Sequence, residues 1–179
     1  MKAKSFLQAA KLTAVILFLL ALLFLAVYFR FTSFFDVKAF NKNSDTDVFL
    51  CAEADKIPDT YKEYNDGFFG FRMYRSESGS TELKTSSFPD AVIGKSKVTG
   101  IYLKENNTDG NILGIKIGDD DSVAYKQLEK YKFKNINASN DRITAEKNKI
   151  RIRISLGDNY EVKEISVTLD TTNIFKIQY

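Results

Sequence analysis

The chain has 179 residues, which is room for one ordinary domain or two very small ones. It contains no histidine, so catalytic arrangements that need an imidazole are excluded, and its single cysteine excludes an internal disulfide. The formal net charge of +3 belongs to the N-terminal segment, because acidic and basic residues are nearly balanced from Thr46 onward. The charge is therefore no evidence for nucleic-acid binding, and we expect no nucleic-acid partner.

Residues 12–29, LTAVILFLLALLFLAVYF, form an apolar run in which Thr13 and Tyr28 are the only polar residues. As a helix with a rise of ~1.5 Å per residue, this run spans roughly 27 Å, close to the ~30 Å hydrocarbon thickness of a bilayer. It is longer than the apolar core of a signal peptide and ends in bulky rather than small residues. We therefore expect an uncleaved transmembrane anchor, with the lipid bilayer as its partner.

The flanks of the apolar run predict its orientation. Three lysines and no acidic residue precede it: Lys2, Lys4 and Lys11. Because a lysine-rich flank stays in the cytoplasm, we expect a single-pass protein of the cell membrane with residues 1–11 as a cytoplasmic tail. Residues 30–47 are then a juxtamembrane tether, and residues 48–179 form an extracytoplasmic, extracellular domain.

That domain is predicted to consist mainly of antiparallel strands separated by turn residues. Strand patterns occur at residues 68–74, 97–104, 149–156, 162–169 and 173–179. One segment differs, because Ala124, Leu128 and Tyr131 lie on one face of a helix that begins near Asp120 and ends near Phe133. The predicted fold class is α+β: an N-terminal transmembrane helix, followed by a small domain of antiparallel strands with one main helix.

A short internal repeat accompanies this pattern. The pattern V-x-x-I-x-L begins at Val98, and V-x-x-I-x-V begins 64 residues later at Val162. One interpretation is that the domain contains two degenerate half-repeats, at about residues 48–110 and 111–179. The alternative is that two unrelated strands share common strand-forming residues.

Three consecutive aspartates precede the predicted helix: Asp119, Asp120 and Asp121. Aspartate is a favoured N-cap residue and is also favourable in the first turn, where it meets the positive end of the helix dipole. A calcium loop would place its oxygen ligands at alternate positions and end in a glutamate, whereas these three carboxylates are contiguous. We therefore expect a helix cap, with no metal site and no cofactor.

The segment GIKIGD, residues 114–119, followed by a helix with apolar Ala124 and Leu128, resembles a repeat of small bacterial envelope domains. These domains include lipoproteins of the SmpA/OmlA type and β-lactamase-inhibitor-protein-like modules. The resemblance covers roughly Val98–Leu169 and implies a helical segment packed on a small antiparallel sheet. Such modules act by binding proteins, so the resemblance implies no catalytic residues.

The most regular strand pattern carries a basic series. Lys149, Arg151 and Arg153 alternate with isoleucines, so period-two geometry places them together on one outer face. Acidic residues of the returning strand, Glu161 and Glu164, would neutralise them in one interpretation. In the other, the three cations remain unpaired and bind an anionic ligand, which makes them the candidate binding residues.

Together these patterns predict a membrane-anchored extracytoplasmic binding or accessory module of a bacterial envelope. It would contact an envelope protein or an anionic wall polymer, and it would not be an enzyme. The alternative is an envelope enzyme that uses carboxylates or a Ser/Lys pair, although no particular pair is marked by the sequence.

Overall fold

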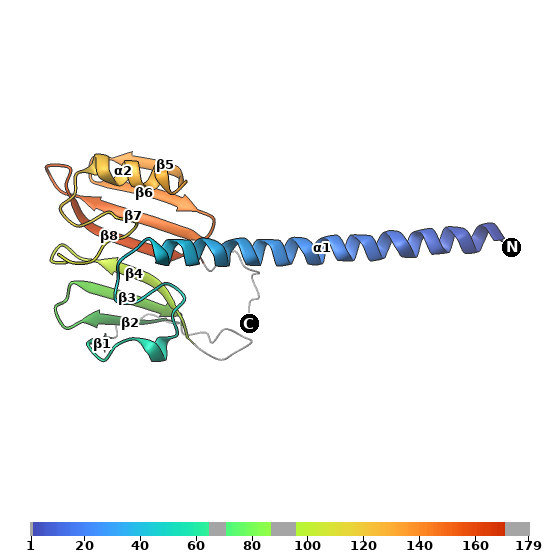
Figure 1. Ribbon diagram of the computed structural model, residues 1–179, viewed down its shortest axis with the longest axis horizontal. Helices are drawn as coiled ribbons and strands as arrows, with labels where there is room; N and C mark the ends of the chain where they lie inside the picture. The colour runs from blue at the N-terminus through green and yellow to red at the C-terminus, as the bar shows by residue number, and fades with distance from the viewer. Residues whose placement is uncertain (1, 65–70, 87–95, 171–179) are drawn as a thin grey trace. The chain divides into compact units, whose positions relative to one another are not determined.

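The computed structural model describes residues 2–64, 71–86 and 96–170. Its elements, labelled in Figure 1, are α1 (Lys2–Lys42), the short 3-10 helix η1 (Ala54–Lys56), β1 (Tyr61–Tyr64), β2 (Phe71–Ser76), β3 (Thr81–Ser86), β4 (Val98–Leu103), α2 (Asp121–Lys130), β5 (Lys134–Ser139), β6 (Arg142–Lys147), β7 (Ile150–Leu156) and β8 (Val162–Leu169). The strand predicted at residues 173–179, and the beginning of the one predicted at 68–74, lie outside the described residues. The chain divides into two compact units, Met1–Asp36 and Val37–Tyr179.

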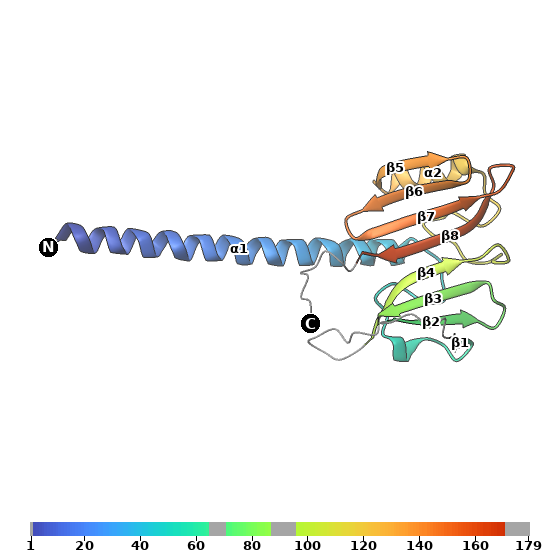
Figure 2. The same ribbon diagram turned by 180° about the vertical axis from the view of Figure 1, so that it is seen from behind.

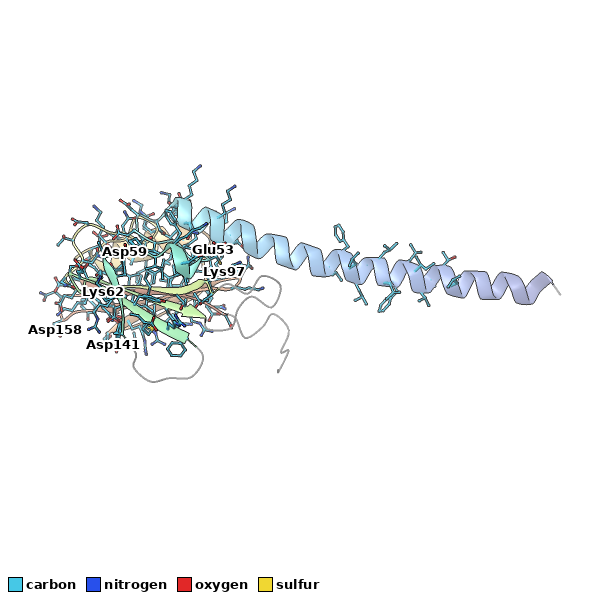
Figure 3. All side chains as sticks on the ribbon, turned by 90° about the horizontal axis from the view of Figure 1, so that it is seen from below. Glu53, Asp59, Lys62, Lys97, Asp141 and Asp158 are labelled. Carbon is cyan, nitrogen blue, oxygen red and sulfur yellow. The ribbon has the colours of Figure 1, made fainter. Side chains whose placement is uncertain are left out.

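The first unit is helical, and its side chains from Leu12 to Leu25 are exposed. The exposed fractions are 63% for Leu12 and 71% for Phe24. The side chains drawn along this part of α1 project from opposite sides of the helix (Figure 3). The stretch therefore has apolar residues around its whole circumference and lacks a polar face. As far as the residues are described, no helix combines the length and the apolar character needed to span a membrane.

The second unit contains one eight-stranded sheet with the strand order β1-β2-β3-β4-β8-β7-β6-β5. Each neighbouring pair is antiparallel, so the sheet consists of two four-stranded meanders that meet where β4 pairs with β8. The predicted α+β class with antiparallel strands is confirmed. We call the contact between β4 and β8 the seam.

The two similar sequence patterns lie on the two strands of the seam. The one that begins at Val98 is β4 and the one that begins at Val162 is β8, each the last strand of its meander. Ile101 lies opposite Val167 across the seam, and both are buried. The proposal of two half-repeats stays a prediction, but its two patterns occupy corresponding positions in the two meanders.

One face of the sheet is covered and forms the core. Figures 1 and 2 place α2 against this face beside β5 and β6, and its Ala124 and Leu128 are fully buried there. Burial of one leucine side chain contributes about 1.5–3 kcal/mol, which explains why this short polar helix is held in place. Apolar residues of β4, β7 and β8 belong to the same hydrophobic core as these two residues of α2.

The second unit begins inside the segment that was predicted as a tether. Helix α1 continues to Lys42, and its last turns bring Phe40 into the core together with Val48 and Leu50. The side chain of Asn41 donates to the carbonyl of Leu50 at 2.9 Å and accepts from the amide of Leu50 at 3.1 Å. This pair of hydrogen bonds fixes the loop after α1 to the end of the helix.

Candidate binding face

The face of the sheet opposite the core carries two continuous rows of residues. Residues directly opposite one another in antiparallel strands point to the same side, so the register defines each row. The first row is Lys62, Arg75, Glu82, Tyr102, Ser166, Arg153, Thr144 and Asn137, and the second is Tyr64, Met73, Lys84, Gly100, Thr168, Arg151, Glu146 and Lys134. We call these positions the outer face. Figure 2 views the sheet from this side, with α2 behind β5 and β6.

The outer face is basic although the unit that carries it is balanced. Its charged residues are six cations, Lys62, Arg75, Lys84, Arg151, Arg153 and Lys134, and two carboxylates, Glu82 and Glu146. From Val37 to the end of the chain, acidic and basic residues are equal in number. The loops carry much of the acid; Asp59, Asp141 and Asp158, labelled in Figure 3, all lie between strands or before β1.

A network of ion pairs joins the two meanders next to the seam. Glu82 on β3 accepts from Arg75 on β2, with Nη2 of Arg75 at 2.7 Å, and pairs with Lys104 at 3.2 Å. Lys104 follows β4 and also contacts Glu164 on β8 at 3.2 Å. The chain of contacts therefore runs from β2 through β3 and β4 to β8, and it ties one half of the sheet to the other.

The same contacts shift the ionisation of the network. Burial opposes ionisation of Glu82, but hydrogen bonds from Arg75 and Tyr64 and the charge of Lys104 outweigh it, so the pKa of this carboxyl lies below its ordinary value. Burial would by itself lower the pKa of Lys104, but Glu164 and Glu82 raise it above the ordinary value. Both groups are therefore held in their charged forms.

Tyr102 lies flat at the centre of the outer face because Gly100 leaves room for it. A Cβ atom at Gly100 would lie 3.2 Å from a carbon of the Tyr102 ring and 3.3 Å from its hydroxyl oxygen. It would also meet the Cβ atom of Lys84 at 3.2 Å. Burial is the main reason that the pKa of Tyr102 is raised, so its hydroxyl stays protonated and able to donate.

The three basic residues predicted as a binding series are not equivalent. Lys149 precedes β7 and is half-buried, whereas Arg151 and Arg153 are exposed members of the outer face. The Nε atom of Arg151 pairs with Glu146 of β6 at 2.8 Å. The partner is therefore on the preceding strand, and the acidic residues expected on the returning strand do not fill this role.

Arg153 has a different environment. Within the described residues, its guanidinium makes no hydrogen bond and no ion pair, and it lies between Thr144 and Ser166 in its row. Lys134 at the edge of the same face is exposed and likewise has no such partner among the described residues. These two cations hold positive charge that the rest of the described face does not neutralise.

An open hollow adjoins the seam at the end where Lys104 lies. Its volume is about 730 Å³, and its lining includes Lys104, Ser155, Leu156 and Glu164. Because Lys104 and Glu164 are already paired with each other, the hollow presents few uncommitted polar groups. It extends the outer face beyond the two rows.

The acidic triplet lies away from this face, at the beginning of α2. Asp120 is the N-cap and its side chain accepts from the amide of Ser122 at 3.0 Å. Asp119 accepts from the amide of Lys116 at 2.7 Å and so closes the preceding loop, while Asp121 is the first helical residue. Among the described residues there is no group of three or more acidic or cysteine side chains placed to hold a metal ion.

Several residues of the outer face were not identified from the sequence. Tyr102 of the outer face and its neighbour Lys104 belong to the strand predicted at residues 97–104, where alternation already indicates that they share a side. Glu82 and Lys84 lie on β3, TELKTS, whose polar composition gives no clear strand signal. Arg75 becomes part of the face only through pairing of β2 with β3, which the sequence pattern does not specify.

Comparisons of the chain with family models, with curated proteins and with solved structures give no match.

Proposed function

We propose that this protein is a membrane-anchored, extracytoplasmic binding module whose outer sheet face contacts another component of a bacterial envelope. The observation that carries the proposal is the concentration of positive charge on one face of a unit whose acidic and basic residues are equal in number. Opposite potentials on two surfaces accelerate their encounter and select the partner. A face that spans all eight strands suits a contact surface better than a reaction centre.

The proposed anchor is the apolar run of residues 12–29. Two observations support it: the length of the run in the sequence, and the exposure of every side chain from Leu12 to Leu25. Exposed apolar residues around a whole helix need an apolar environment, which lipid provides. The lysines before the run support an orientation with the N-terminus in the cytoplasm.

The arrangement of charges favours this function over the rival envelope enzyme. A reaction centre needs ionisable groups that converge on uncommitted space. The best-connected carboxylate of the face, Glu82, is instead committed to Arg75 and Lys104, and the adjoining hollow is open. The described residues therefore support a module that binds.

The binding role is tested by photocrosslinking in intact cells of the source organism. A photoreactive phenylalanine derivative is placed at Ser166 on the outer face or, as a matched control, at the exposed Lys126 of α2. The proposal predicts an adduct, to protein or to polymer, from position 166 and none from position 126. Absence of an adduct at position 166, or equal adducts from both positions, would contradict it.

A further inference from the structure

We propose that the outer face binds a linear phosphate-bearing polyanion that lies across the seam between β4 and β8. This inference rests on the proposed function and names the ligand class for the same face. Charge complementarity is its first support, because six cations and two carboxylates leave the two rows with an excess of positive charge. The same excess disfavours a second copy docked face to face, since like charges would oppose one another.

The spacing of the cations favours a polymer over a small anion. In the second row Lys84 and Arg151 lie on β3 and β7, with Gly100 and Thr168 of the seam between them. Neighbouring strands are ~4.8 Å apart, so the backbones of these two residues are about 14 Å apart across the sheet. The Nζ atom of Lys84 lies 4.0 Å from the centre of the Phe71 ring, and Arg151 pairs with Glu146 on β6, so the two charges are held apart. A chain with several charges meets both more readily than one phosphate ion does.

The lack of an exposed apolar anchor disfavours a folded protein as the ligand. In the second unit the exposed large hydrophobic residues, among those described, are Phe49 and Tyr160, and neither belongs to the outer face. Strong protein interfaces usually depend on a few large side chains that enter pockets. Here the energy of binding has to come mainly from charge and hydrogen bonds, which is the pattern of polyanion binding.

Hydroxyl groups between the cations favour phosphate. Tyr102, Ser166 and Thr168 lie on the two strands of the seam, and Thr144 lies on β6 opposite Arg153. Phosphate oxygens are commonly bound by arginine and lysine together with serine, threonine and tyrosine hydroxyls. Arg153, whose guanidinium has no ion pair among the described residues, lies between Thr144 and Ser166 and is the central cation of this arrangement.

The test uses the full chain in nanodiscs of zwitterionic lipid and fluorescently labelled linear polyphosphate as the probe. Binding is measured by fluorescence anisotropy over a series of salt concentrations. We expect the affinity of the wild type to fall steeply with salt, and Arg151→Glu/Arg153→Glu to bind at least about tenfold more weakly. Arg153→Gln, which removes the charge but keeps a polar side chain and creates no repulsion, should show a smaller loss of affinity.

The matched control is Lys126→Glu/Lys130→Glu, which makes the same change of charge on exposed positions of α2. It should bind as the wild type does, and thermal melting of each variant checks its fold. An equal loss of affinity in the two double variants, or no salt-dependent binding by the wild type, would overturn the inference. Tighter binding of poly-L-glutamate of equal length would assign the face to an acidic polypeptide. In each case a crosslink specific to position 166 would leave the binding function itself intact.

Discussion

Glu82 and Arg153 lie in the same row, on either side of Tyr102 and Ser166, but their charges have different roles. Glu82 is nearly buried and pairs with two cations, so it holds strands together. Arg153 is exposed and its guanidinium has no such pair within the described residues. Charge that is already paired stabilises the fold, whereas charge left unpaired on a surface is free to attract a ligand.

Glu82→Gln should lower the free energy of unfolding by about 1 kcal/mol near neutral pH, after allowance for solvent screening. Because the folded state lowers the pKa of Glu82, the ionised carboxylate stabilises the fold above its ordinary pKa. This contribution is lost as the pH falls from about 4.5 through the lowered pKa, so the two proteins should converge there. Urea unfolding at several pH values measures the difference.

Glu164→Gln is the matched control for this change. Glu164 is more exposed than Glu82 and pairs with one cation of the network, Lys104, whereas Glu82 pairs with two. It should lower the stability less than Glu82→Gln does. A pH-independent loss in Glu82→Gln, or an equal loss in both variants, would show that the charge of the buried carboxylate at position 82 does not hold the strands together more strongly than that of Glu164.

Helix α2 is the element whose position depends most on a local signal. Its N-cap Asp120 satisfies an amide that would otherwise lack an intrahelical partner. Its apolar contribution is small, with Ala124 and Leu128 as the buried residues. A helix of ten residues is marginal in isolation, so both the cap and the packing are needed.

Asp120→Ala should lower the melting temperature by about two to four degrees, because the cap is lost while the buried face is unchanged. Glu129→Ala removes one negative charge from the last turn of the same helix and should not have this effect. Differential scanning calorimetry of the two variants gives the comparison. A wild-type melting temperature for Asp120→Ala would mean that packing alone fixes α2.

At the scale of the whole molecule, local patterns predict some elements and not their arrangement. The alternation of isoleucines in β7 and the pattern in β8 predict buried strands, and the aspartates before α2 predict the beginning of a helix. The short polar strands β3 and β5 have no such alternation in their sequences. Pairing with their neighbouring strands holds them in the sheet, and a single strand's sequence does not show this pairing. No local pattern specifies that β4 pairs with β8, and this contact creates the outer face.

The same limit applies to prediction of the candidate site. Arg151 and Arg153 are identified from one strand, but their partners depend on the neighbouring strands. Glu146 lies on β6, and Tyr102 and Ser166 belong to the two strands of the seam. A surface made from two rows across eight strands is therefore visible only once the strand order and register are known.

Cysteine footprinting on intact cells tests whether the unit is anchored, with its outer face occupied, outside the cytoplasmic membrane. The native thiol of Cys51 is exposed and would itself react, so it is first removed by Cys51→Ser. In this variant Ser166→Cys places a thiol on the outer face, and Lys126→Cys places one on α2. A membrane-impermeant maleimide is added to intact cells, and each labelling rate is divided by the rate for the purified protein. We expect rapid labelling at position 126 in cells and a several-fold lower relative rate at position 166. No labelling at either position in intact cells would contradict the proposed topology, and equal relative rates at both would contradict the proposed binding face.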